Sequence, residues 1–489
     1  MIFGDDKMAV FSIIKLSELE GAKRISAEFY QPHFLKIKET LLNCGAKSLE
    51  NYLSLLYRYP TFYNLEYHKE GVLVLKGEDI TQHGFIQNQS QDYIAVSDAS
   101  RFPKTILEEN DLIFSVRGFV GKVGIIDTKY VGSIISANLI RAKIHGLSPY
   151  FVWVFLNSKY GNFQLNRIKM ITSQETILAD DIRGILVPLL TENFQKQIES
   201  LSKSAIERIR NSETLYSQAE TLLLEELDLK DFKPRYQKTY TANLSSAFSA
   251  HRIDAEYFQP AYEEVINLLK KKVKVEKLKN IVSFIDHGKQ PYYVENGDIP
   301  VLIQKHLGFQ LLSLYSEIIN MPDTPRTDRN FVRRYPDYLI KPYDVLFYSV
   351  GAYLGRTNVV LENFEAVPAS FITLIRTQQE ICNPVYLSLF LNSEIGKLQS
   401  SRWKSASAQQ YIYPKEIKEF IIPILPLLTQ QKIASLVQES HSARKRAKEL
   451  LEVAKKTVEI AIENNEKEAL EYISKADKKL KNLITLKKN

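Results

Sequence analysis

Cysteine is nearly absent from this chain: Cys44 and Cys382 are the only two among 489 residues. Such a pair supports neither a disulfide framework nor a cysteine-based zinc site, and a reducing compartment is expected. Apolar runs stay well short of the roughly 18 residues that suggest a membrane span. The opening stretch MIFGDDKMAVFSIIKL also lacks the basic region and long apolar core of a signal peptide. The sequence therefore predicts a soluble, cytoplasmic protein with no membrane contact.

Catalytic signatures are missing as well. There is no G-x-x-x-x-G-K-[ST], and the glycines of GFVGKVG at residues 118–124 are not spaced as in the dinucleotide fingerprint. A tight turn between two strands is the preferred interpretation of that segment. The eight histidines are scattered without a metal-binding spacing. We therefore predict no catalytic residue, no metal and no cofactor in this chain.

The composition is that of a folded protein. Hydrophobic residues make up 45% and aromatic residues 11% of a chain long enough for two or three domains. Lys and Arg number 64 against 57 Asp and Glu, a formal charge of +7. This mild basic excess favours an anionic partner without requiring one.

The most informative feature is an internal repeat. RISAEFYQP at residues 24–32 returns as RIDAEYFQP at residues 252–260, which is 228 positions later. SPYFVWVFLNSKYGNFQLNRIK, from residue 148, aligns without a gap with NPVYLSLFLNSEIGKLQSSRWK, from residue 383, at an offset of 235. Units of this length are too long for a solenoid. The repeat predicts a duplicated domain.

Each copy has the same predicted order of elements. A helix follows the QP of the repeated phrase, and short runs with β-branched and aromatic residues then predict strands. The predicted strands include residues 71–76, 111–116, 122–126, 345–350 and 358–361. The apolar segments from residues 149 and 384 are predicted to be buried helices that end near Gly161 and Gly396. The fold class is α+β.

After each copy the pattern becomes that of a long helix with a heptad-like seam. The first predicted seam is Ile198, Leu201, Ala205, Arg208, Ser212, Leu215, Ala219 and Leu222. The second is Ile433, Leu436, Ser440, Ala443, Ala447, Leu450, Ala454 and Thr457. Matched positions in two copies favour antiparallel pairing about a pseudo-twofold axis. The alternative is that each helix packs only on its own domain.

These patterns predict five segments. They are a first domain at 1–194, a first spacer helix at 195–228, a polar connector at 229–251, a second domain at 252–429, and a second spacer helix with a Lys-rich tail at 430–489. About 30 helical residues would span roughly 45 Å. That length is comparable to the 34 to 36 Å, roughly, between half-sites one turn apart on duplex DNA.

Basic and amide-bearing loops are the candidate DNA contacts, because Arg and Lys bind phosphate or guanine while Ser, Asn and Gln contact base edges or backbone. In the first copy these are Arg117, Lys122, Arg167, Lys169, Ser173 and Gln174. In the second they are Tyr353, Arg356, Arg402, Lys404, Ser407 and Gln409. The alternative for any single residue is an ordinary surface side chain.

The duplicated phrase, the FLNS motifs with their following glycine, and IPILPLLTQQKIASL with the helix after it resemble the specificity (S) subunits of type I restriction-modification systems. The resemblance covers nearly the whole chain. It implies two α/β target recognition domains, each reading half of a bipartite asymmetric DNA target, separated by a long antiparallel two-helix coiled coil. It also implies that this chain is not an enzyme.

The partners that the resemblance implies are double-stranded DNA, two modification (methyltransferase) subunits that use S-adenosylmethionine, and ATP-dependent restriction subunits. The long N-terminal lead and the Lys-rich tail leave open a type IIB-like system. A coiled-coil adaptor that joins protein partners is the main alternative, and an unfamiliar nuclease is another. Steep salt dependence would distinguish DNA binding from an apolar protein interface.

Overall fold

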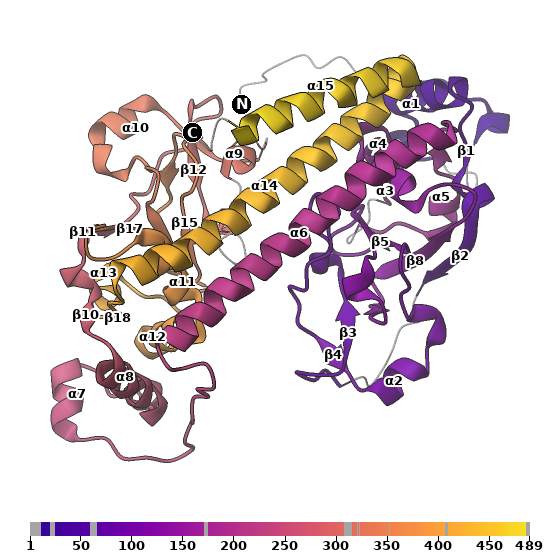
Figure 1. Ribbon diagram of the computed structural model, residues 1–489. Helices are drawn as coiled ribbons and strands as arrows, with labels where there is room; N and C mark the ends of the chain where they lie inside the picture. The colour runs from indigo at the N-terminus through magenta and orange to yellow at the C-terminus, as the bar shows by residue number, and fades with distance from the viewer. Residues whose placement is uncertain are drawn as a thin grey trace. The chain divides into compact units, whose positions relative to one another are not determined.

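The computed structural model describes residues 11–19, 25–58, 66–170, 175–307, 315–319, 321, 323–351, 353–405 and 409–485 (Figure 1). The chain forms two compact units: unit 1 comprises Met1–Arg208 and Arg446–Asn489, and unit 2 comprises Ile209–Lys445. Two long helices, α6 (Glu192–Glu226) and α14 (Leu427–Glu463), contribute residues to both units. Among the described helices, none is long and apolar enough to cross a membrane.

Unit 1 contains three small sheets. The four-stranded antiparallel sheet has the order β2 (Leu53–Arg58), β8 (Leu139–Ile144), β5 (Leu112–Ser115), β6 (Val123–Ile125). The three-stranded sheet has the order β4 (Tyr93–Ile94), β3 (Val72–Leu75), β7 (Ile134–Ile135), in which β3 and β7 are parallel. A third pair joins β1 (Lys47–Ser48) to β9 (Leu186–Val187). Its helices are α1 (Pro32–Asn43), α2 (Val96–Ser100), α3 (Pro149–Asn157), α4 (Lys159–Arg167), α5 (Ala179–Arg183) and the C-terminal α15 (Glu466–Thr485).

Unit 2 repeats this arrangement strand for strand. Its four-stranded sheet has the order β11 (Val282–His287), β17 (Ile372–Thr377), β14 (Val345–Tyr348), β15 (Thr357–Val359). The smaller sheets are β13 (Arg326–Thr327), β12 (Ile299–Leu302), β16 (Val367–Pro368) and the pair β10 (Val275–Lys277), β18 (Ile421–Pro423). Its helices are α7 (Leu244–Ala250), α8 (Pro260–Lys272), α9 (Tyr315–Ile318), α10 (Arg329–Arg334), α11 (Pro384–Asn392), α12 (Glu394–Trp403) and α13 (Pro414–Ile417). The predicted duplication and the α+β class are confirmed.

The repeated FLNS motif holds each helical pair on its sheet. In unit 1 the Asn157 side chain donates to the backbone oxygens of Val123, at 3.1 Å, and Trp153, at 2.9 Å. In unit 2 Asn392 exchanges two hydrogen bonds with the backbone of Thr357. Because Val123 belongs to β6 and Thr357 to β15, the asparagine fixes the helix against the edge strand of the four-stranded sheet.

The glycine that follows FLNS has a role other than the predicted one. The buried helices end at Asn157 and Asn392, so the prediction that they end near Gly161 and Gly396 is wrong. Both glycines lie inside the next helix, where an added Cβ at Gly161 would lie 2.3 Å from the Cα of Leu156. Only glycine therefore allows the two short helices to approach this closely.

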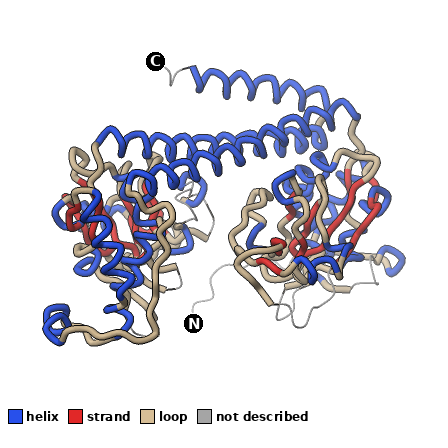
Figure 2. Tube along the Cα trace, turned by 60° about the horizontal axis from the view of Figure 1, so that its bottom comes forward, coloured by secondary structure: helices blue, strands red, loops and turns tan. Residues whose placement is uncertain are grey.

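The long helices pair with each other in an antiparallel direction within the units (Figure 1, Figure 2). In unit 2 the hydroxyls of Ser212 and Ser440 lie 3.0 Å apart. In unit 1 Thr191, just before α6, donates its backbone N–H to Glu466, beyond the end of α14. Lower residue numbers on α6 thus meet higher ones on the partner segment. Pairing in both units confirms the coiled-coil prediction over the alternative that each helix packs only on its own domain.

The register of the seam differs from the predicted one at every second position. On α6 the buried positions are Ile198, Ser202, Ala205, Ile209, Ser212, Tyr216, Ala219 and Leu223. On α14 they include Ile433, Val437, Ser440, Arg444, Ala447, Leu451, Ala454 and Val458, together with Ala443 and Thr457. Leu201, Arg208, Leu215 and Leu222 are only partly buried. The buried positions on each helix are alternately four and three residues apart, so on α6 Ile209 occupies the seam position predicted for Arg208. The buried cation of the seam is Arg444 on α14.

An Arg–Asp ion pair occurs in both sheets, with the two arginines two positions apart in strand register. In unit 1 Arg141 on β8 donates to Asp111 at 2.7 Å, and both side chains are at most 3% exposed. In unit 2 Arg376 on β17 donates to Asp344 at 2.8 Å. Burial raises the pKa of both carboxyl groups, while the arginine opposes that shift. The duplicated pair joins the central strand to the turn that precedes β5 or β14.

Candidate nucleic-acid interface

Each four-stranded sheet has one end at which three segments meet. In unit 1, strand β2 ends at Arg58, the loop 116–122 leaves β5, and Thr176 forms a bridge with Arg117. We call this end, with Arg58, Arg117 and Thr176, the first edge. The backbone N–H of Ile177 donates to Val116 at 3.2 Å and holds the returning segment there.

The second edge is the equivalent end in unit 2, with His287, Val350 and Tyr411. Strand β11 ends at His287, and Val350 bridges Tyr411 as Arg117 bridges Thr176. The backbone N–H of Ile412 donates to Ser349 at 2.9 Å. Position by position, Arg58 therefore corresponds to His287 and Arg117 to Val350.

The first edge is cationic. Arg117 is exposed and Arg58 is half-buried. Burial, and then the charge of Arg117, lower the pKa of the Arg58 guanidinium, so the two cations interact. Lys169 lies nearby: a Cβ at Gly121 in the same loop would lie 3.2 Å from its Cε, and its Nζ is 3.8 Å from Glu175. This edge can attract an anionic or electron-rich ligand.

The side chains that define the second edge are uncharged, and an aromatic ring packs against them. The hydroxyls of buried Ser349 and Thr373 lie 2.6 Å apart, and Thr373 lies 2.9 Å from Nδ1 of His287. Burial lowers the pKa of His287, which favours the neutral ring. Tyr413 packs edge-on to that ring at 5.7 Å and is 45% exposed. These groups offer hydrogen bonding and stacking, and the half-exposed ion pair of Asp286 and Lys289 lies beside them.

The predicted pair Lys122 and Arg356 serves the fold. Lys122 donates from Nζ to the backbone oxygen of Ile80 at 2.7 Å, and Arg356 donates to that of Leu307 at 3.3 Å. Burial lowers the pKa of both cations. Each side chain links the β5–β6 or β14–β15 loop to the segment after β3 or β12. This placement argues against a direct DNA contact.

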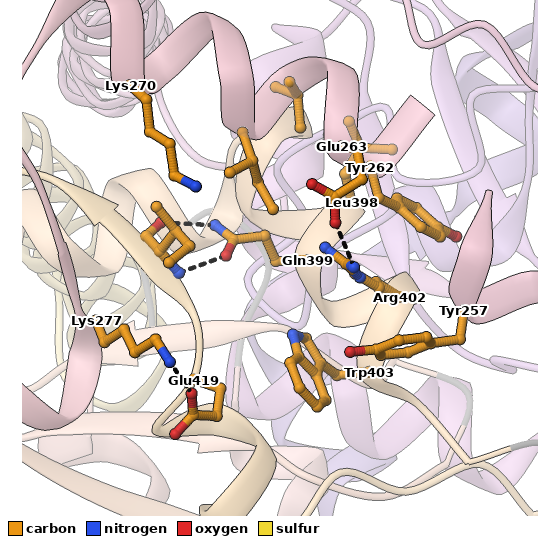
Figure 3. Close-up of a pocket in the computed structure, with 13 residues that line it drawn as sticks. Tyr257, Tyr262, Glu263, Lys270, Lys277, Leu398, Gln399, Arg402, Trp403 and Glu419 are labelled. Atoms are coloured by element: carbon orange, nitrogen blue, oxygen red, sulfur yellow. Dashed lines mark hydrogen bonds and ion pairs between the residues drawn. The ribbon is translucent and has the colours of Figure 1, made fainter. Parts of the chain in front are cut away.

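Arg167 and Arg402 also have partners within their own units. Arg167 is buried, donates from Nε to the backbone oxygen of Phe29 at 2.9 Å, and lies 4.0 Å over the Phe29 ring. Arg402 pairs with Glu263 at 2.6 Å and lies 4.7 Å over Tyr257, beside a groove of about 260 Å³ (Figure 3). In both units, therefore, the repeated phrase packs against a repeated arginine, and these contacts lie within the fold.

The other predicted contacts have mixed placements. Tyr353 is 58% exposed with Arg356 stacked on its ring at 4.3 Å, and Gln409 is exposed. Lys404 is half-buried, and its backbone oxygen accepts from Arg252 at 2.9 Å. Ser173, Gln174 and Ser407 lie outside the described residues.

Sequence reasoning missed Arg58 and His287. Both end a strand, and both meet a loop that the prediction did include. The strands LSLLYR and VSFIDH end in different residue types, so the sequences do not show that their last positions are equivalent. Their equivalence follows only from the pairing of Arg58 with Ile140 and of His287 with Thr373. In the described part of the chain, no group of three or more His, Cys, Asp or Glu residues could hold a metal ion.

The chain thus has a duplicated α+β fold with paired long helices and with different polar groups at two equivalent edges. Residues 270–452 match the family model described as type I restriction modification DNA specificity domain. This match lies in the second half of the chain and confirms the resemblance drawn from the repeated motifs. The first half has the same strand orders.

Solved structures with similar chains bear related names. One is the S subunit of a type I restriction-modification system from M. genitalium, with 16% identity, 84% of this chain and 94% of that chain covered, and a TM-score of 0.39. Another is the HsdS subunit from Thermoanaerobacter tengcongensis, with 15% identity, 86% and 96% covered, and a TM-score of 0.28. No curated protein matches the chain.

Proposed function

We propose that this chain is the DNA-reading subunit of a type I restriction-modification complex and that it binds a bipartite, asymmetric duplex target. Unit 1 would read one half-site and unit 2 the other. The observation that carries the proposal is the recurrence of one fold with different side chains at equivalent edges, Arg58 and Arg117 against His287 and Val350. Two domains with the same fold but different side chains at equivalent positions are suited to bind half-sites of different sequence.

The same proposal assigns chemistry to partners. Two methyltransferase subunits, which would bring S-adenosylmethionine, are proposed to dock on the chain, and ATP-dependent restriction subunits would join them. This chain itself would be non-catalytic, would contain no cofactor and would act in the cytoplasm. The paired helices α6 and α14 are proposed to set the unread gap between the half-sites.

Selection from random duplexes tests this function. The purified full chain, alone and with its co-expressed methyltransferase, is incubated with a random duplex library, and the bound DNA is sequenced. The proposal expects two short conserved blocks of different sequence separated by a constant gap. Binding should weaken steeply with added salt, because a contact to each phosphate releases a counterion. A single block, or salt-insensitive capture without sequence preference, would reject it.

A further inference from the structure

Two arginines of unit 1 lie at the same end of one sheet. Strand β8 runs between β2 and β5, and Ile140 on β8 is opposite Arg58 on one side and Phe114 on the other. Adjacent strands are about 4.8 Å apart, so the backbones of Arg58 and Phe114 lie roughly 10 Å apart. Arg117 follows shortly after Phe114, just before the loop turns at Gly118 with φ 76°. Two long side chains can therefore converge on one ligand at this end.

Neither guanidinium has a carboxylate partner in the described part of the chain. By contrast, Arg183 of the same unit lies 3.4 Å from Glu50, and Arg101 lies 3.3 Å from Asp98. The neighbouring segments 59–65 and 171–174 contain no acidic residue in their sequences. Two interacting cations without a counter-charge repel each other, and an electron-rich ligand between them removes that cost.

The differences between the two edges indicate whether these arginines would contact DNA phosphates or base edges. Phosphates are the same in every duplex. If these positions contacted phosphate, a cation would be expected at the equivalent position in both units. The second edge instead has His287 and Val350 where the first has Arg58 and Arg117. Positions that differ between otherwise duplicated heads carry the sequence information. For arginine the best-matched base edge is guanine, whose O6 and N7 accept from the guanidinium fork.

We propose that Arg58 and Arg117 are the side chains that read guanine in the half-site bound by unit 1. This inference rests on the proposed function, and it adds the residues and the base. Arg58 comes from the end of β2 and Arg117 from the β5–β6 loop, and β8, which pairs with both strands, brings them to the same end of the sheet. His287 fills the place of Arg58 in unit 2, and the half-site bound by that unit is not expected to share this guanine.

The test is selection from the random duplex library with the full chain and with the variants Arg58→Gln and Arg117→Gln. Arg183→Gln is the matched control, because Arg183 on α5 lies near Glu50, just before the opposite end of β2. One half-site should lose its guanine preference in each edge variant, and affinity for the wild-type target should fall about 10- to 100-fold, the usual value of a bidentate contact. The other half-site and the control should be unchanged.

Two further variants keep the test decisive. Arg58→Lys and Arg117→Lys retain the charge but lose the fork, so non-specific binding should persist while the guanine preference weakens. If all four edge variants retain the guanine, or if they weaken binding equally on every sequence, the inference is wrong. A wild-type chain that selects no bipartite motif would instead reject the proposed function. A bipartite motif insensitive to both arginines would reject only this assignment.

Discussion

Replacing Arg167 with alanine separates a structural role from a DNA-contacting one. The wild-type guanidinium donates to the Phe29 carbonyl at 2.9 Å and lies 4.0 Å over the Phe29 ring, and the side chain is buried. A hydrogen bond from a charged donor contributes about 1.5–3 kcal/mol, and a desolvated cation–π contact about 2 kcal/mol. These terms overlap, so we expect the Phe29 segment to lose roughly 2–4 kcal/mol of local stability.

Hydrogen exchange followed by mass spectrometry measures this loss directly in the full chain. The amides of α1, which follow the Phe29 segment, should exchange about 30- to 1,000-fold faster if they open together, since each 1.4 kcal/mol, roughly, is a factor of ten. Arg183→Ala is the control, because Arg183 forms only exposed ion pairs and should change local exchange little. Base preference at both half-sites should stay as in the wild type.

One result would refute this reasoning. If Arg167→Ala left the exchange of α1 unchanged and altered the bases selected at one half-site, the arginine would contact DNA after all. Arg402→Ala gives a second trial in unit 2. Its partner Glu263 is 57% exposed, so the expected loss of local stability there is smaller than for Arg167.

Three other perturbations have defined outcomes. Burial lowers the pKa of His306 to about 4, so the folded state resists protonation of this ring. The free energy of unfolding should therefore be highest above about pH 6.5 and fall by up to about 3 kcal/mol toward pH 4. Unfolding measured across this pH range should show a flatter dependence for His306→Asn. Asp111→Ala removes the buried carboxylate that pairs with Arg141 and leaves that guanidinium only exposed Glu108 and the Lys104 carbonyl; we expect a cost of about 3 kcal/mol in urea unfolding. Glu108→Ala, at an exposed carboxylate, should cost under about 1 kcal/mol. Seven residues inserted into both α6 and α14 lengthen each helix by about 10 Å, and methylated-site mapping should find a gap longer by about 3 base pairs; an unchanged gap would contradict the spacer role.

Much of the fold could be predicted from the sequence because its information is local or repeated. Strands β3, β5, β6 and β14 fall within their predicted runs, and β15 begins one residue before its run; in all of them β-branched and aromatic residues favour a pleated, half-buried surface. The duplication can be recognised in the sequence because both copies have the same residues where helices pack on the sheet, among them Asn157 and Asn392. The predicted pairing of long helices followed from seams at matched positions.

The seam register shows where local reasoning stops. Leu201 and Ser202 are adjacent, and hydrophobicity favours leucine as the inward residue. The paired helices bury Ser202 instead. Which of two neighbouring residues faces the partner depends on the rotation of the whole helix, and that rotation is set by all the contacts along it.

The sequence by itself determined that the chain is a duplicated α+β protein with paired long helices and a resemblance to specificity subunits, because duplication and periodicity are properties of residue order. Only the tertiary structure decided the roles of the arginines. Arg167 and Phe29 are 138 residues apart, and Arg58 reaches the Arg117 loop only across β8. The sequence shows that a residue is arginine but does not show whether its guanidinium is buried against a carbonyl or exposed. That environment is formed by distant segments that folding brings together.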